Sequence, residues 1–274
     1  MTELTLQEIQ QESLRILRQV HAFCLKNGIR YSLAYGTMIG AARHKGFIPW
    51  DNDIDIYMPR PDYERFCDNF HAPGLGIISE KDKTCFINFC RVYDTERTLA
   101  KVRYPSADHC EGGIWIDIFP MDGAPDDYSQ FLAKMKHLRR YYIQHSYIRK
   151  AIGGDINYHD KESLILSFYR NLTPTKWCIR KVNQILRKGA REYEFGSTGH
   201  WTDYSCIHIG DNNFHLLEER DHIGSTEFEG EQFCMLEDYD AILRRRYGDY
   251  MQLPPEKDRN PKGHDHFYWK DDNH

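Results

Sequence analysis

The first stretch of the chain alternates apolar and polar residues with the spacing of an amphipathic helix. Thr5 and Glu8 form a capping box ahead of this stretch, and Gly28 follows it at the position where helices often end. Together these signals predict one long helix between Thr5 and Gly28. Its apolar face comprises Ile9, Ile16, Leu17, Val20, Phe23 and Cys24.

Shorter runs of apolar and β-branched residues then predict strands at residues 30–34, 53–58, 86–93, 98–102 and 114–119. Pro61 marks the start of a short helix between the second and third of these strands. Helices and strands alternate irregularly, which favours a small mixed sheet with packed helices over a doubly wound parallel sheet. The predicted fold class is therefore α+β.

The last third of the chain returns to strands. Its pattern predicts a strand at 204–209, a hairpin that turns at Glu229 and Gly230, and a helix over 237–247 that ends at Gly248. We expect residues 1–125 to form a catalytic core and residues 126–200 a basic helical segment. Residues 201–274 would supply the strands and the helix that complete the core.

The segment between residues 126 and 191 is strongly basic. It holds 14 Lys and Arg against five Asp and Glu, whereas the whole 274-residue chain has a net charge of -5. Asp126 and Asp127 precede Phe131, Met135 and Leu138 at helical spacing, which predicts a helix there. Most of these charges are expected on solvated helix faces. As a functional surface, the segment would attract an anionic partner such as a membrane or an acidic glycan.

The overall composition is that of a folded globular protein. Apolar residues make up 41% and charged residues 28% of the chain, which excludes a disordered protein and a membrane-spanning bundle. Charged residues interrupt the first 25 positions, so we expect no signal peptide and a cytoplasmic location. The eight cysteines include no Cys-x-x-Cys pair, and in a reducing compartment we expect free thiols rather than disulfides or structural zinc.

Three short pieces of sequence carry candidate chemistry. Gly36 and Thr37 follow a predicted strand and open a helix of small residues, where backbone N–H groups and a hydroxyl can approach a phosphate. Asp53 and Asp55 alternate on a predicted strand, so their carboxylates share one face and repel each other unless a cation such as Mg²⁺ neutralises them. Asp117, on a later strand, can complete a metal site.

Each of these pieces also has an ordinary structural explanation. A Gly-Thr pair is usually a turn, an Asp-x-Asp pair is often a solvated edge, and an Asp between two isoleucines can simply face outward. In this order and on these elements, however, the three pieces together match the signature of the nucleotidyltransferase fold.

The run of residues 35–55, YGTMIGAARHKGFIPWDNDID, resembles the hallmark of the LicD-type phosphotransferases, to which fukutin and fukutin-related protein are similar. The resemblance continues at residues 58–63, 115–122 and 247–255, so it covers nearly the whole chain. Asn52 stands where the family usually has Asp. Because its side chain should point away from Asp53 and Asp55, we expect little effect on catalysis.

The resemblance implies transfer of a phospho-alcohol, phosphocholine first or an alditol phosphate, from a CDP-activated donor. The acceptor would be a hydroxyl of a cell-surface glycan or teichoic acid precursor, and CMP would leave. Asp53, Asp55 and Asp117 would be the catalytic and metal-binding residues, with Mg²⁺ as cofactor and Mn²⁺ as its alternative. Two roles stay open for Asp117, which either ligates the metal or takes the proton of the acceptor hydroxyl.

Further residues are candidates for binding the substrate. Arg43, His44 and Lys45 follow the Gly-Thr helix and could reach the donor phosphates, although the helix dipole alone also favours basic residues at a helix C-terminus. Trp50 and Trp115 border the acidic strands and could hold a quaternary ammonium by cation-π contact, although most tryptophans in such places belong to the core.

Two other functions remain open. A nucleotidyltransferase of the same fold would transfer the nucleoside monophosphate itself, and a glycan-binding protein would have a decayed site. The second is disfavoured because Gly36, Asp53, Asp55 and Asp117 are all present. The expected partners are an anionic or lipid-linked glycan and the inner face of the membrane, without nucleic acid. Whether His264 and His266 in the polar tail bind anything is not decided by the sequence.

Overall fold

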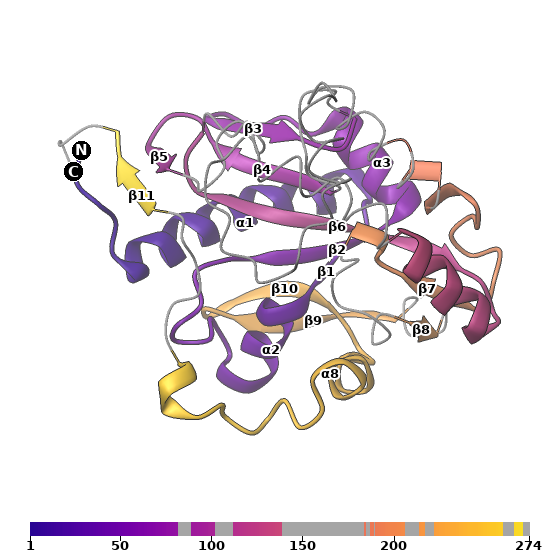
Figure 1. Cartoon of the computed structure of the whole chain (residues 1–274). Coiled ribbons are helices and arrows are strands. Elements are labelled where there is room, and N and C mark those ends of the chain that lie inside the picture. Colours follow the sequence, from indigo (N-terminus) through magenta and orange to yellow (C-terminus); the bar gives the residue numbers. More distant parts are fainter. Residues whose placement is uncertain are drawn as a thin grey trace, which may run out of the picture.

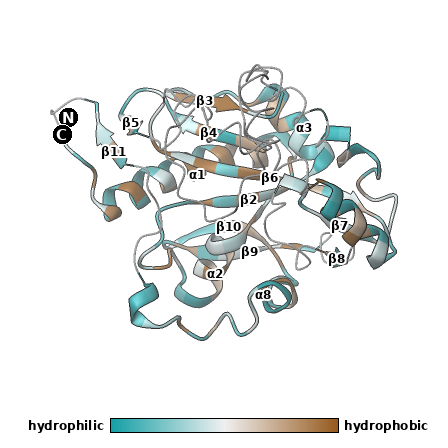
Figure 2. Cartoon of the chain, in the orientation of Figure 1, coloured by the Kyte–Doolittle hydropathy of each residue, from teal (hydrophilic) through white to brown (hydrophobic). Residues whose placement is uncertain are grey.

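The computed structural model describes residues 1–81, 89–101, 112–138, 184, 187–188, 190–205, 214–216, 222–259 and 266–270. Within these residues the helices pack around a main mixed sheet, which confirms the predicted α+β class (Figure 1). Hydrophobic and hydrophilic patches alternate along the first helix, α1 (Leu6–Asn27), as expected of an amphipathic helix (Figure 2).

The central path of the main sheet runs β1 (Ser32–Leu33), β2 (Asp55–Pro59), β6 (Trp115–Ala124), β4 (Cys90–Asp94) and β3 (Leu75–Ile78). Strands β2 and β6 are parallel, and the other neighbours on this path pair antiparallel. The last residues of β6 pair with β7 (His200–Thr202), which pairs with β8 (His215–Leu216). This mixed order confirms that the sheet is not doubly wound.

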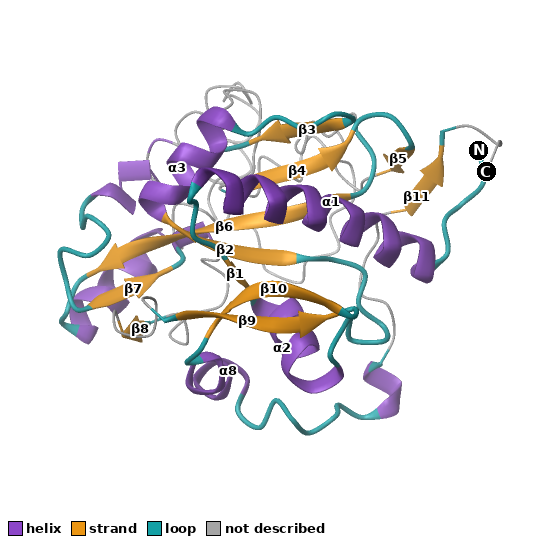
Figure 3. Cartoon of the chain, turned by 180° about the vertical axis from the view of Figure 1, so that it is seen from behind, coloured by secondary structure: helices purple, strands orange, loops and turns teal. Residues whose placement is uncertain are grey.

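Helix α1 lies across one face of the main sheet, as the view from behind shows (Figure 3). The capping box is confirmed, because the Thr5 hydroxyl accepts from the backbone N–H of Glu8 while the Glu8 carboxylate accepts from that of Thr5. Gly28 ends the helix with φ at 58°, a left-handed conformation that glycine adopts without strain. Pro61 lies in the first turn of α3 (Arg60–Asn69), as predicted.

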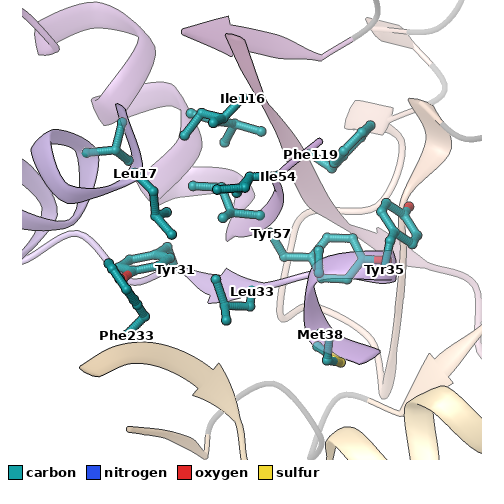
Figure 4. Close-up of a cluster of buried hydrophobic side chains, with 14 of the residues drawn as sticks. Leu17, Tyr31, Leu33, Tyr35, Met38, Ile54, Tyr57, Ile116, Phe119 and Phe233 are labelled. Atoms are coloured by element: carbon teal, nitrogen blue, oxygen red, sulfur yellow. The ribbon is translucent and has the colours of Figure 1, made fainter. Parts of the chain in front are cut away.

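Isoleucines at the two parallel strands pack toward α1. Ile54, directly before β2, and Ile116 of β6 are fully buried beside Leu17 of α1 (Figure 4). Because successive side chains of a strand point to opposite faces, Asp55 and Asp117 lie on the face of the sheet away from α1. The apolar face thus determines where the acidic face lies.

The C-terminal part of the chain packs beside β1. A hairpin of β9 (Ile223–Phe228) and β10 (Glu231–Leu236) turns at Glu229 and Gly230, as predicted. The backbone N–H of Leu236 donates to the Ser32 hydroxyl at 2.9 Å, which ties β10 to β1. Helices α2 (Tyr35–His44) and α8 (Tyr239–Tyr247) lie on the same side of the molecule as this hairpin (Figure 1).

The remaining described elements include a second small sheet. Strand β5 (Thr98–Lys101) pairs with β11 (His266–Trp269), and a 3₁₀ helix, η3 (Glu256–Asp258), precedes β11. Residues 128–138 are helical, as predicted, and the Asp127 carboxylate accepts from the backbone N–H of Gln130 at 2.8 Å. Most of the basic segment beyond residue 138 lies outside the described residues.

The strand predicted at 204–209 is wrong where the structure describes it. Tyr204 and Ser205 form a 3₁₀ turn, because the Asp203 carboxylate accepts hydrogen bonds from both the backbone N–H and the hydroxyl of Ser205. This local bonding competes with strand pairing. Among the described residues here, strand β7 ends at Thr202, directly before Asp203.

Two negative findings hold for the part of the chain that the structure describes. Cys24, Cys67, Cys90 and Cys234 are free thiols, as predicted for these four. No described helix combines the length and apolar character that a membrane crossing requires.

Candidate active site

Three charged side chains from three neighbouring strands form a row across the sheet. Asp55 on β2 is the register partner of Asp117 on β6, and Asp117 is the register partner of Arg91 on β4. Register partners point to the same face of a sheet, so the three side chains lie together on the face away from α1. Two carboxylates and one guanidinium therefore meet at the centre of the sheet.

Arg91 holds Asp117 through two hydrogen bonds. Its Nε donates to Oδ1 at 2.7 Å and its Nη2 donates to Oδ2 at 3.2 Å. The guanidinium also lies 4.2 Å from the centroid of the Trp115 ring, and Arg91 is only 8% exposed. Trp115, predicted to receive a quaternary ammonium, therefore already stacks with a cation of the protein.

Burial and the neighbouring carboxylates raise the pKa values of Asp53 and Asp55. Partial removal from water, followed by the charges of Asp51 and Asp117, raises the pKa of Asp53 above its usual value. Burial, followed by the charges of Asp53 and Asp117, raises the pKa of Asp55 well above its usual value, and Arg246 partly opposes this shift. Asp53 is exposed and Asp55 is half-buried. Solvent therefore reaches these carboxylates and screens part of the repulsion between them.

This donor set fits a hard cation in part. Among the described residues, no three His, Cys, Asp or Glu side chains are arranged as the ligands of one metal ion. Asp53 and Asp55 nevertheless supply carboxylate oxygens whose mutual repulsion a cation would relieve. Mg²⁺ commonly binds through one or two carboxylates plus substrate phosphates. The residues therefore fit a two-carboxylate site whose other ligands come from the substrate and water.

Gly36 and Thr37 lie in the first turn of α2 and support the acidic segment. The buried Thr37 hydroxyl accepts a hydrogen bond from the backbone N–H of Asp55 at 2.9 Å. A Cβ at Gly36 would lie 2.8 Å from Oδ2 of Asp51, so glycine permits the close approach of that carboxylate. Contact of these two residues with a donor phosphate stays a prediction, whereas their contacts with the acidic segment are observed.

Tyr35, the first residue of α2, is anchored from the C-terminal part of the chain. Its φ of 47° lies in the left-handed region, which is uncommon for a bulky residue. Its hydroxyl donates to the Asp203 carboxylate, and its ring lies 4.0 Å from the Arg246 guanidinium of α8. Asp203 and Arg246 therefore help to position the start of the helix that carries Gly36.

Arg43 and Lys45, at the end of α2, also contact the C-terminal part. Arg43 donates through Nη1 to the Tyr250 carbonyl and through Nε to Nε2 of His44, the latter at 2.9 Å. Lys45 ends α2 with φ at 60°, and its carbonyl accepts from the backbone N–H of Glu229 at 2.8 Å. These contacts give the three residues a structural role, and their contact with donor phosphates stays a prediction.

The contacts of Trp50 and His266 are with residues outside the acidic row. Trp50 packs partly buried against the hydrophobic core, with the Arg259 guanidinium 5.9 Å from its ring centroid. The Nδ1 atom of His266 lies 2.6 Å from the Glu3 carboxylate, whereas His264 lies outside the described residues.

Sequence reasoning did not single out four residues of this site. Asp51 continues the period-two spacing of Asp53 and Asp55, so that spacing could have indicated it. Arg91 joins the site only through the register of β4 on β6, and Asp203 meets Tyr35 across a separation of 168 residues. Arg246 likewise reaches the site from a distant helix. No local pattern marks these three contacts.

Comparisons with known proteins converge on one family. Residues 28–152 match the family described as LicD/FKTN/FKRP, nucleotidyltransferase domain. The chain is 33% identical over 280 residues to the lipopolysaccharide cholinephosphotransferase LicD of Haemophilus influenzae, which covers 95% of this chain and 97% of that protein.

Two other relatives match shorter segments. The ribitol 5-phosphate transferase FKRP of Homo sapiens is 27% identical over 114 residues, which are 40% of this chain and 22% of that protein. An uncharacterized protein of Rickettsia prowazekii is 40% identical over 79 residues, which are 26% of this chain and 30% of that protein. Of these two, only the human relative carries a name that appears in the matching family description. Each match covers less than a third of the relative's own length.

Proposed function

This chain belongs to the LicD family, and on that basis we propose that it is a metal-dependent phosphotransferase. The transferred group is a phospho-alcohol, phosphocholine before an alditol phosphate, and the donor is the CDP-activated alcohol. The acceptor is a hydroxyl of a cell-surface glycan or teichoic acid precursor, and CMP leaves. The same proposal places the enzyme in the cytoplasm, at the inner face of the membrane, where a lipid-linked acceptor is accessible.

The named activities of the relatives support this substrate class. The relative that matches along nearly its whole length is a cholinephosphotransferase acting on lipopolysaccharide, and the human relative is a ribitol 5-phosphate transferase. Both names describe transfer of an alcohol that carries its own phosphate. Phosphocholine comes first because the cholinephosphotransferase match extends over 95% of this chain.

One structural observation carries the proposal, namely the carboxylates gathered at the beginning of β2 and on β6. Asp53 and Asp55 have raised pKa values, and Asp117 lies opposite Asp55 on the adjacent strand. Phosphoryl transfer depends mainly on positioning and on neutralising negative charge, with little covalent chemistry by the protein. Such a cluster would be costly for a protein that had no cation to bind.

The proposed reaction is a single displacement at phosphorus. The acceptor hydroxyl oxygen forms a bond to the phosphorus that carries the alcohol, the bond from that phosphorus to the CMP oxygen breaks, and the hydroxyl proton passes to a base. Asp53 and Asp55 would hold Mg²⁺, or Mn²⁺, which supplies charge neutralisation to the donor diphosphate. Backbone N–H groups in the first turn of α2, at Gly36 and Thr37, would receive a donor phosphate.

Asp117 has two compatible roles in this scheme. It either adds an oxygen ligand for the cation or accepts the proton of the acceptor hydroxyl. Its position beside Asp55 suits both roles.

A donor panel followed by product analysis tests the function. Thermal melting of the full chain with Mg²⁺ and CDP-choline, CDP-ribitol or CDP-glycerol should show one donor that stabilises, by about 2.7 kcal/mol at a hundredfold excess over Kd. With that donor and a lipopolysaccharide or teichoic acid preparation, CMP should appear while the acceptor gains the alcohol phosphate. Asp53→Ala is the inactive control.

Other products would contradict the proposal. An acceptor that gains the nucleotide instead would identify a nucleotidyltransferase. Absence of both donor stabilisation and CMP release would favour a glycan-binding protein.

A further inference from the structure

A buried arginine lies beside the third carboxylate of the site, and the steps described above do not use it. Arg91 comes from β4, a strand that supplies no other residue to the acidic cluster as described. Its side chain is 9% exposed, and it bonds both oxygens of Asp117. Its position is determined by the strand register, which pairs it directly with Asp117.

Arg91 restricts the orientation of the Asp117 carboxylate. Two nearly parallel N–H···O bonds from one planar guanidinium hold both the position and the plane of a carboxylate. The guanidinium is in turn supported by Trp115, whose ring centroid lies 4.2 Å away. Trp115 precedes Asp117 by two positions on β6, so both side chains project from the same face. Strand, ring and guanidinium therefore fix Asp117 together.

The ion pair still leaves Asp117 able to act. Each carboxylate oxygen has about two acceptor positions, and the two bonds from Arg91 use one on each oxygen. The Asp117 side chain keeps 16% of its surface exposed. An oxygen of Asp117 can therefore contact a cation or a hydroxyl proton while Arg91 remains bound.

We propose that Arg91 is a positioning residue of the transfer reaction, which holds Asp117 in the one orientation that serves the site. This inference rests on the proposed function, because Asp117 acts in that reaction. Partners that orient a metal ligand typically change metal affinity or activity about 10- to 100-fold when they are altered.

The same strand provides a matched control. Arg60 binds Asp122, also on β6, with bonds of 2.6 and 2.8 Å, and its guanidinium lies 4.8 Å from the Tyr63 ring centroid. Asp122 is only 1% exposed. This pair resembles the Arg91–Asp117 pair in geometry, but the proposed reaction gives it no role.

The experiment compares Arg91→Lys with Arg60→Lys in the full chain. Both variants keep the positive charge but lose the planar guanidinium group that bonds both carboxylate oxygens. Mn²⁺ binding to the donor-free protein is measured by calorimetry, and kcat and the donor KM are measured with the CDP donor, all per folded molecule. We expect Arg91→Lys to lower Mn²⁺ affinity or kcat about 10- to 100-fold with little change in KM. Arg60→Lys should leave all three unchanged.

A double-mutant cycle tests whether Arg91 acts through Asp117. In an Asp117→Asn background, Arg91→Lys should cause no further loss, because the oriented carboxylate is already gone. If the losses of Arg91→Lys and Asp117→Asn are additive, the inference is overturned. Equal effects of Arg91→Lys and Arg60→Lys would also overturn it, and Arg91 would then have only a structural role.

The cycle also separates this inference from the proposed function. A wild-type chain that binds Mn²⁺ but transfers nothing from any CDP donor contradicts the function, and the cycle in Mn²⁺ affinity still tests Arg91. If the wild-type chain transfers the group but the losses of Arg91→Lys and Asp117→Asn add up in the double variant, only the role of Arg91 is contradicted. A chain that neither binds Mn²⁺ nor transfers contradicts both.

Discussion

Strand β6 carries two aspartates that are each held by a buried arginine, and the two pairs differ mainly in their surroundings. Arg91 binds Asp117 where β6 runs between β2 and β4. Arg60 binds Asp122 where β6 pairs with β7. Both guanidiniums bond both carboxylate oxygens, so the geometry of the pairs alone does not distinguish them.

The Arg60–Asp122 pair is closed, in the sense that other protein groups surround it and exclude solvent from Asp122. Arg60 also bonds Glu64 and Glu80, and Asp122 is almost fully buried. Burial raises the pKa of Asp122 to about 6 although Arg60 opposes the shift. The pair at Asp117 instead lies beside Asp55 and keeps some exposure. An arginine–aspartate pair thus indicates a reactive site only where further carboxylates and solvent reach it.

The largest expected effect comes from removing the acids next to Asp117. Asp53→Ala and Asp55→Ala should each abolish transfer, by about 1,000-fold or more, because each removes a cation ligand. Melting without metal should hold or rise, since carboxylate repulsion is relieved. Asp122→Ala is the matched control, which should lower the melting temperature but keep turnover per folded molecule. Near wild-type turnover of either site variant with Mg²⁺ would show that this pair is not the metal site.

The next effect concerns the two aspartates of β6 themselves. Asp117→Asn keeps the shape and one oxygen, so donor binding should largely survive while transfer slows by about 100- to 10,000-fold. A Mg²⁺ titration of turnover separates the two roles, because extra metal rescues a weakened ligand but does not replace a base. Asp122→Asn should not slow transfer per folded molecule. Wild-type rates for Asp117→Asn at ordinary Mg²⁺ would remove Asp117 from both roles.

Breaking the closed pair should reduce stability rather than activity. Arg60→Met leaves Asp122 without its main partner in a buried position, and such a loss typically costs about 3–5 kcal/mol of unfolding free energy. Urea unfolding followed by circular dichroism measures this change, and turnover is normalised to the folded fraction. Unchanged stability, or lost turnover in the folded protein, would reverse the roles assigned to the two pairs.

The smallest expected effect is a pH dependence at Asp122. Folding raises the pKa of Asp122 from 3.8 to about 6, so folding favours its protonated form. Its contribution to stability is therefore present below about pH 4 and is lost as the pH rises through about 6. Relative to Asp122→Asn, the wild-type unfolding free energy should fall by up to about 3 kcal/mol between pH 4 and pH 7. Urea unfolding across this range tests it, and a constant or rising difference would contradict the assignment.

Local signals predicted a large part of the fold. The capping box of Thr5 and Glu8, the left-handed Gly28 and the turn at Glu229 and Gly230 all depend on a few adjacent residues. Alternation along β2 and β6 likewise placed Asp55 and Asp117 opposite the buried isoleucines. The strand predicted at 204–209 was wrong because the Asp203 side chain bonds its own neighbours, a local contact that apolar periodicity does not register.

The acidic pieces of the site could be found from local sequence, because period-two spacing and adjacency are properties of a short segment. The residues that contact these pieces became known only from the folded chain. Arg91 contacts Asp117 through the register of two strands, and Asp203 and Arg246 contact Tyr35 from distant parts of the chain. Register and long-range packing depend on how whole elements bury their apolar faces against one another, and no single segment contains that information.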